Sequence, residues 1–143
     1  MTNQPVDLFH YIGSDLSASN IGDLQSVSGT VKGQQRVLRR LLTNPQTFDA
    51  SGKPQTSGDY IFHPEYGAGL PSYVGKTMDI PKITAVIRGQ MLLESCVAKN
   101  PAPIINVSPI NGGFTGGLFI QIQYADAITG DPVSFSFNVS APK

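Results

Sequence analysis

Apolar and polar residues alternate most regularly in the last third of the chain. Two stretches place apolar side chains at every second position, at 118, 120, 122 and 124 and again at 133, 135, 137 and 139. Alternation with a period of two is typical of strands that bury one face. Together with an apolar run at 104–107, it predicts a three-stranded antiparallel meander joined through 111–117 and 126–132. The last strand has a serine-lined polar face, and we expect it to be an edge of the sheet.

Two other stretches repeat their apolar residues at helical spacing. The first predicts a helix over 29–43 with one apolar face, made of Val31, Leu38, Leu41 and Leu42. The second predicts a helix over 80–98, which Asp79 caps and which has Pro81 in its first turn. Its apolar residues span a broad arc, so we expect it to be buried on more than one side and to cover the sheet. Gly89 inside it indicates that another backbone passes close by.

The remaining segments are polar and rich in turn-forming residues. The stretch 44–58 is predicted to be an exposed loop, because it holds little apolar material and several prolines and glycines. Short strands are predicted at 8–12 and 24–27. The whole pattern predicts an α+β fold: a C-terminal meander covered by a long helix, with a strand and helix segment before it. We expect an N-terminal extension over 1–21 and one domain over 22–143.

The stretch 59–71 connects the two predicted helices. The run Tyr60-Ile61-Phe62 favours a strand that ends at His63, and Pro64 keeps the next turn out of the helical region. Two glycines then permit backbone angles that other residues resist. We call this stretch the hub, because we expect it to fix how the two helices and the meander face each other, with Tyr66 at least partly buried. The alternative is an ordinary surface loop with two buried aromatics.

Composition narrows the possible partners of the chain. Ten Lys and Arg balance ten Asp and Glu among 143 residues, and charged residues make up 14 % of the chain, against about 25 % in an average domain. Such a chain has no global attraction for nucleic acid or anionic lipid. The low charge suits a subunit covered by neighbours, although a surface rich in Ser, Asn and Gln explains it equally well. We find no export signal and no apolar stretch long enough for a membrane span.

Positive charge is concentrated on the first predicted helix, at Lys32, Arg36, Arg39 and Arg40. No aromatic stacking residues are interleaved with this basic cluster, so a solvated helix face or a contact with a protein partner is favoured over nucleic-acid binding. Arg39 and Arg40 also lie near the helix C-terminus, where cations complement the helix dipole.

Residues for catalysis or metal binding are sparse. The two histidines, His10 and His63, lie in no nucleophile motif, and the single Cys96 is expected to be a buried structural thiol inside the second helix. His63 and Glu65 have no third ligand close in sequence, so no metal or cofactor is expected. Glycoside hydrolysis needs only two carboxyl groups, and the only glutamates are Glu65 and Glu94. We favour an ion pair between Glu94 and an arginine, of this chain or a neighbour, over catalysis.

The order of these parts resembles the baseplate wedge family of contractile-tailed phages, often called tail lysozyme-like. The family includes the small wedge subunit of T-even phages and its counterpart in type VI secretion baseplates. The resemblance covers about residues 22–140 and is sharpest in Arg40-Leu41-Leu42-Thr43 followed by Pro64-Glu65-Tyr66-Gly67.

The resemblance implies a structural, non-enzymatic subunit of the virion's tail baseplate, made in the host cytoplasm and present in multiple copies in a symmetric assembly. It implies packing against a helical bundle of other baseplate wedge subunits and docking of the first ring of tail sheath protein by β-strand pairing, without nucleic acid or membrane partners. We expect the partner-binding residues to be Pro64, Glu65, Tyr66, Gly67, Glu94, Arg39, Arg40 and Phe137.

The chain departs from the family at the end of the long helix. The family has a Glu-Pro-Arg triplet there that helps to hold the wedge core, and the corresponding residues in this chain are Glu94-Ser95-Cys96. Only the glutamate is kept, so the contact of the triplet does not carry over as a whole. Two other functions stay open: a peptidoglycan-cleaving muramidase that uses Glu65 and Glu94, and a stand-alone adaptor protein with the same fold.

Overall fold

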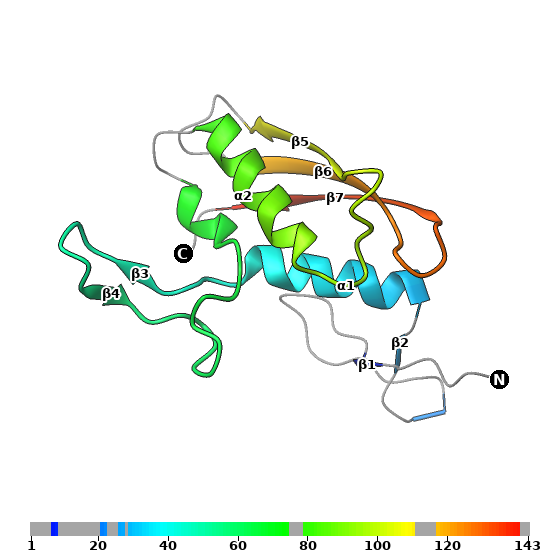
Figure 1. The fold of residues 1–143 in the computed structure, drawn as a ribbon, viewed down its shortest axis with the longest axis horizontal. Helices are drawn as coiled ribbons and strands as arrows, with labels where there is room; N and C mark the ends of the chain where they lie inside the picture. The colour runs from blue at the N-terminus through cyan, green and yellow to red at the C-terminus, as the bar shows by residue number, and fades with distance from the viewer. Residues whose placement is uncertain are drawn as a thin grey trace.

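The computed structural model describes residues 7–8, 21–22, 26–27, 29–74, 79–110 and 117–140. Its two α-helices and one 3-10 helix are α1 (Gly29–Leu42), η1 (Leu70–Tyr73) and α2 (Ile80–Leu92), and its main sheet consists of β5 (Ile104–Pro109), β6 (Leu118–Ala125) and β7 (Pro132–Val139). Figure 1 shows both α-helices lying across this sheet. The mixed α+β class predicted from the sequence is therefore confirmed.

The C-terminal sheet is the predicted meander. Its strands pair antiparallel in the order β5-β6-β7. Ile122, in the central strand, lies opposite Ile105 on one side and Phe135 on the other. Cross-strand partners point to the same face of a sheet, so the apolar positions of all three strands form one surface. The predicted connection 111–117 lies outside the described residues except for Gly117.

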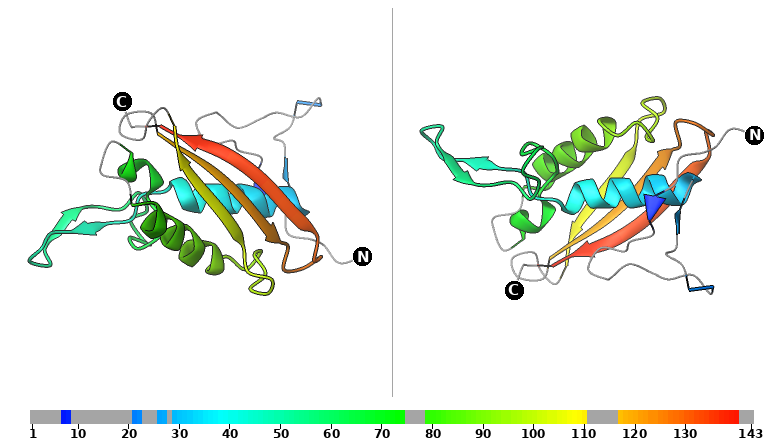
Figure 2. Two further views of the ribbon diagram at one scale, coloured as in Figure 1. Left: turned by 90° about the horizontal axis from the view of Figure 1, so that it is seen from above. Right: turned by 90° about the horizontal axis from the view of Figure 1, so that it is seen from below.

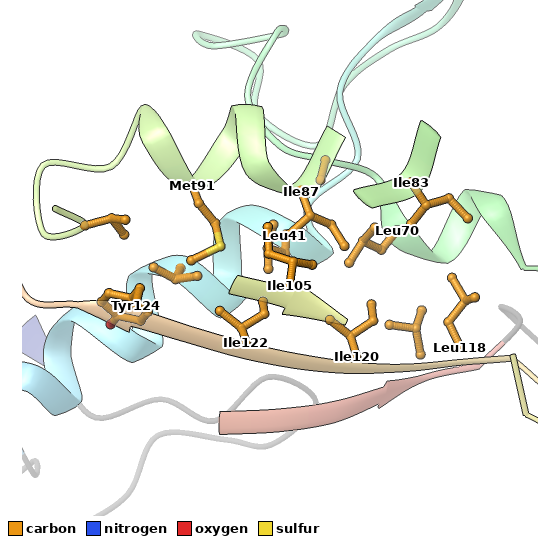
Figure 3. Close-up of a cluster of buried hydrophobic side chains, with 14 of the residues drawn as sticks. Leu41, Leu70, Ile83, Ile87, Met91, Ile105, Leu118, Ile120, Ile122 and Tyr124 are labelled. Carbon is orange, nitrogen blue, oxygen red and sulfur yellow. The ribbon is translucent and has the colours of Figure 1, made fainter. Parts of the chain in front are cut away.

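Both α-helices cover the apolar face of this sheet (Figure 2). Their buried side chains meet those of β5, β6 and β7 in a single core, in which Leu41, Leu70, Ile87 and Ile120 are fully buried (Figure 3). The opposite face carries small polar side chains that are exposed to solvent, Asn106, Gln121, Gln123, Ser134, Ser136 and Asn138. The sheet is thus covered on one side by the described residues.

The helix α2 begins as predicted but ends earlier. The Asp79 carboxylate accepts a hydrogen bond from the Lys82 backbone N–H over 3.2 Å, and Pro81 lies in the first turn. The helix ends at Leu92 instead of 98, because the chain then turns back to the sheet, where the Ala98 N–H donates to the Ala125 carbonyl. The expectation of burial on several sides was also wrong, because the buried residues form a single stripe of Ile83, Ile87 and Met91.

The helix α1 spans the predicted residues but turns a different face to the core. Its buried residues are Gly33, Val37 and Leu41, whereas Val31 is exposed. Gly33 determines this orientation, since a Cβ atom there would lie only 3.3 Å from the Cys96 Cβ and 3.5 Å from the Tyr124 hydroxyl. The missing side chain lets the helix lie directly against these two residues.

The predicted strand at 60–62 does not form. These residues make a turn, and Ile61 and Phe62 are 86 % and 89 % exposed, so Phe62 is not one of the two buried aromatics of the alternative interpretation. The backbone on either side bonds to the segment that follows α1 instead: the Asp59 N–H donates to the Asn44 carbonyl, and the Gln46 N–H donates to the Pro64 carbonyl. These bonds tie down both ends of the run and leave its apolar side chains in solvent.

The other predicted segments are short. The stretch 44–58 is exposed, as predicted, and contains a small antiparallel hairpin of β3 (Thr47–Phe48) and β4 (Pro54–Thr56). Near the N-terminus, β1 (Asp7–Leu8) pairs antiparallel with β2 (Ser26–Val27). The rest of the predicted strands 8–12 and 24–27, and most of the predicted extension 1–21, lie outside the described residues.

The end of the hub crosses the C-terminus of α1 very closely. The Ala68 and Gly69 N–H groups donate to the Arg40 and Thr43 carbonyls over 3.0 and 2.9 Å, which satisfies acceptors that a helix end leaves open. Gly67 has a φ of 113°, and a Cβ atom there would overlap the Thr43 carbonyl oxygen. The close backbone approach predicted at Gly89 is absent, because nothing lies within 4 Å of a Cβ atom at that exposed position.

Substitution by alanine should have opposite effects on stability at Gly67 and at Gly89. We expect Gly67→Ala to lower the free energy of unfolding by about 3 kcal/mol, since the new methyl group needs a disfavoured φ and displaces the backbone of α1. Gly89→Ala should raise it by up to about 1 kcal/mol through helix propensity. Urea unfolding of both variants measures the difference. A Gly67→Ala protein as stable as the wild type would contradict the close crossing.

Candidate functional site

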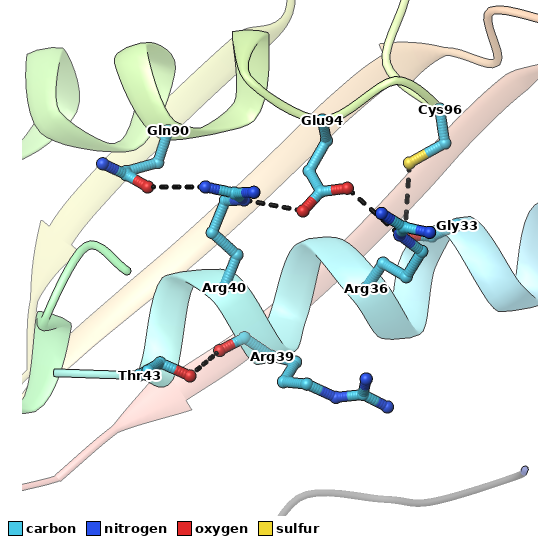
Figure 4. A network of polar contacts seen from close by, with 8 residues as sticks. All are labelled: Gly33, Arg36, Arg39, Arg40, Thr43, Gln90, Glu94 and Cys96. Carbon is cyan, nitrogen blue, oxygen red and sulfur yellow. Dashed lines mark hydrogen bonds and ion pairs between the residues drawn. The ribbon is translucent and has the colours of Figure 1, made fainter. Parts of the chain in front are cut away.

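Two arginines of α1 converge on the buried carboxylate of Glu94. Glu94 is 3 % exposed. Its Oε1 accepts a hydrogen bond from the Arg40 Nε over 2.6 Å, and its Oε2 accepts one from the Arg36 Nε over 3.1 Å (Figure 4). The Arg40 side chain is only 14 % exposed, and that of Arg36 is 44 % exposed. We call these three residues the Glu94 clasp. It joins α1 to the end of α2.

The spacing of the side chains along both helices produces the clasp. Arg36 and Arg40 are four residues apart, so they lie on the same face of α1. Gln90 and Glu94 have the same separation, and the Gln90 Oε1 accepts a second hydrogen bond from Arg40, at its Nη1, over 3.2 Å. The Glu94 N–H donates to the Met91 carbonyl, so the carboxylate is held in the turn that ends α2.

The hub adds an aromatic side chain to this group. The Tyr66 ring lies beneath the Arg40 guanidinium, whose carbon atom is 4.2 Å from the ring centroid. The Tyr60 ring meets Tyr66 edge-on, with the centroids 5.2 Å apart. Burial raises the pKa of the Tyr66 hydroxyl, although the nearby Arg40 charge opposes this shift. The predicted partial burial of Tyr66 is confirmed, and Arg40 is held by a carboxylate, an amide and a ring.

The structure brings together some of the predicted site residues and separates others. Tyr66, Arg40 and Glu94 are in contact through the clasp, and Gly67 lies against the end of α1. The other four lie apart from this group: Pro64 is half-buried, Glu65 is exposed, the Arg39 side chain points away from Glu94 (Figure 4), and Phe137 packs on the core side of the sheet.

The sequence prediction missed three members of this site. Arg36, Gln90 and Tyr60 were not expected in it, although the spacing of four residues in Arg36/Arg40 and Gln90/Glu94 was a usable signal. The expectation that this basic cluster is a solvated or partner-binding face was wrong for Arg40, which faces the clasp. The prediction that Glu94 pairs with an arginine is confirmed, and its partners belong to this chain.

Outside the clasp, the described residues contain no cluster of candidate metal-binding side chains. Across the described residues, no group of three or more His, Cys, Asp or Glu side chains is placed to hold a metal ion. No helix in that part of the chain is long and apolar enough to cross a membrane. Cys96 lies after α2 and not within it, half-buried, with its Sγ donating to the Gly33 carbonyl over 3.7 Å. Burial, followed by the Glu94 charge, raises the pKa of this thiol, as expected for a structural cysteine.

Beside Cys96 lies a buried hydroxyl without a partner. The Tyr124 hydroxyl has no hydrogen bond to any described group, although its ring packs edge-on against Phe135. Burial strongly raises the pKa of Tyr124, and the nearby Cys96, Asp126 and Glu94 add to this effect. A buried hydroxyl left unpaired costs stability, so the Tyr124 hydroxyl is expected to destabilise the core.

Comparisons of the chain with models of protein families, with curated proteins and with solved structures find no match. The resemblance to the baseplate wedge family therefore stays a prediction.

The clasp predicts unequal effects for substitutions at two of its members. Glu94→Gln should lower the free energy of unfolding by about 3 kcal/mol, because it leaves the Arg40 charge buried without a counter-charge. Arg36→Met is the matched control and should cost less than about 1 kcal/mol, because the Arg36 side chain is much more exposed to solvent than that of Arg40. Chemical denaturation of both variants tests this. Equal losses would mean that burial does not determine the strength of the clasp.

Tyr124 predicts a dependence of stability on alkaline pH. The unfolded chain releases the tyrosine proton near the ordinary pKa of 10.0, whereas the native protein holds it to higher pH. The unfolded state is therefore favoured as pH rises above 10. We expect Tyr124→Phe to be about 1 kcal/mol more stable than the wild type at neutral pH and to lose less stability between pH 9 and pH 11. Parallel curves for the two proteins in this interval would refute the assignment to Tyr124.

Proposed function

We propose that the protein is a non-catalytic structural subunit of a contractile-tail baseplate wedge. In this role it packs on other wedge subunits and docks the first ring of tail sheath protein by pairing a β-strand with it. It acts as a rigid body in multiple copies within the baseplate of the virion. The proposal rests on the resemblance of the hub and the element order to the family, and on the surface described below.

The observation that carries the proposal is the outer edge of β7. This strand pairs with β6 on one side, and no described residue forms a ladder with its other side. It contains no charged residue, and its only proline is Pro132 at the first position. Natural sheets usually protect their edges with charges, prolines or bulges, and an unprotected edge is a template for a strand from another chain. An eight-residue edge of this kind suits docking by shared β-pairing.

The clasp and the hub support the same role by making the subunit stiff. Glu94 joins α1 to the end of α2, while Ala68 and Gly69 bond across the end of α1. Elements joined in this way move together. A partner bound to the helices and a partner bound to the sheet would therefore be held at a fixed position relative to each other. We propose that wedge subunits contact the hub at the half-buried Pro64.

No observation favours the muramidase alternative. Glu65 is exposed to solvent, whereas both oxygens of Glu94 accept hydrogen bonds from arginines. A glycosidase needs one carboxyl group free to donate a proton and a second that faces the same substrate. Clearing of peptidoglycan by the purified protein, lost in Glu94→Gln, would refute the non-catalytic role.

The edge of β7 gives the sharpest test of sheath docking. The chain is co-expressed with the sheath and wedge proteins encoded beside it, as wild type and as Ser134→Lys/Ser136→Lys. The lysines should abolish co-purification of sheath protein, because charges on an edge strand block strand addition, and should leave the wedge proteins bound. The matched control is Gln121→Lys/Gln123→Lys, on the central strand and the same exposed face. Wild-type protein that binds neither class of partner would refute the proposed function.

A further inference from the structure

The turn between β4 and η1 presents two large apolar side chains to solvent. Ile61 and Phe62 are adjacent and almost fully exposed, and we call this pair the apolar knob. The turn is fixed: the Asn44 N–H donates to the Asp59 carboxylate over 2.7 Å, and the Tyr66 N–H donates to the His63 carbonyl over 3.0 Å. Side chains held out on a rigid turn lose little conformational freedom on binding, which favours their use as an anchor.

A shallow hollow of about 480 Å³, lined by both apolar and polar side chains, lies at the end of α2. It is lined by Leu92, Leu93, Val97, Ala98 and Ala127, together with Glu94, Ser95 and Lys99. Leu93 is 67 % exposed at its rim, and Ile128, which follows Ala127 in the chain, is exposed as well. The hollow therefore offers apolar surface that no described side chain covers.

The charges around the knob and the hollow are complementary. Asp59 and Glu65 flank the knob, and both are exposed. The hollow has the exposed cation Lys99 in its lining, while the carboxylate of Glu94 is already neutralised by its two arginines. Opposite charges around an apolar contact favour one orientation of the two surfaces. The same acidic flanks oppose insertion of the knob into an anionic lipid surface.

The knob does not fill the hollow of its own chain, because Ile61 and Phe62 are almost fully exposed. Figure 1 shows the connection from β4 to η1 beside the base of the β3–β4 hairpin, whereas the connection from α2 to β5 lies further along the long axis. A contact between a knob and a hollow therefore joins two copies. Made head to tail, this contact is heterologous and can propagate from copy to copy.

We infer that Ile61 and Phe62 of one copy insert into the hollow beside Leu93 of a second copy, with Glu65 facing Lys99. Two side chains bury much less area than a standard interface, so the free protein associates weakly. The contact gains strength where an assembly already holds the copies close together. The inference concerns the purified chain alone and does not depend on the proposed function.

Analytical ultracentrifugation of the purified chain at concentrations up to about 1 mM tests this contact. The wild type should form concentration-dependent species larger than a dimer. Phe62→Asp and Leu93→Asp should each weaken association by about tenfold or more, because each places a charge in the apolar contact. Both positions are exposed, so thermal unfolding should confirm that the two variants keep the native fold.

A mixture of these two variants gives the most specific readout. Phe62→Asp keeps an intact hollow and Leu93→Asp keeps an intact knob, so the mixture can form one good contact and should stop at a dimer. Exchanging the charges adds a second readout: Glu65→Lys or Lys99→Glu should weaken association by about threefold, and the double variant should restore it.

Three results would overturn the inference: a wild type that stays monomeric at the highest concentration, association that Phe62→Asp does not change, or a mixture that forms no dimer. If the wild type stays monomeric, the occupant of the knob would be a different protein or a lipid surface, not a second copy. That result would not affect the sheath-docking proposal, which is tested by co-purification on β7.

Discussion

The arrangement of the two helices depends on the desolvated charge of Glu94. A buried carboxylate is costly unless charged donors surround it, and in this protein both donors come from α1 while the carboxylate belongs to the turn that ends α2. Buried ion pairs of this kind add little net stability, but separating the helices would leave charges unpaired in the interior. The relative position of α1 and α2 is therefore fixed mainly because any other arrangement would leave buried charges unpaired. The net strength of the ion pairs matters less.

The hub is also tied to the buried charge of Glu94, because it contacts Arg40, one of the two arginines that bind this carboxylate. Its Tyr66 ring covers Arg40, and its next residues supply donors to the carbonyls at the end of the helix. One arginine thus connects the hub with both helices. Gly67 allows this arrangement because it brings the backbone close enough to the helix end for those hydrogen bonds. The hub is a structural joint, although it contains no regular strand.

Elements set by local spacing could be predicted from the sequence. The alternation around Ile120 and Phe137 predicted the meander, and Asp79 predicted the start of α2. Features that depend on contacts between distant segments could not be predicted. Gly33 and Gly89 look alike in sequence, yet only the former lies against another element. The run at 60–62 has strand propensity, but no described strand lies beside it to pair with. The ring beneath Arg40 comes from a segment 26 positions away in the numbering.

The sheet has one further property, which bears on how fast a partner can bind it. None of the residues in β5, β6 or β7 is charged, so all the formal charge of the chain lies elsewhere. A partner that approaches this edge meets no electrostatic field from the strands themselves to steer it. Such encounters proceed at about 10⁵–10⁶ M⁻¹s⁻¹ and depend little on ionic strength. The lifetime of a complex on this edge would then be set by how slowly its backbone hydrogen bonds come apart.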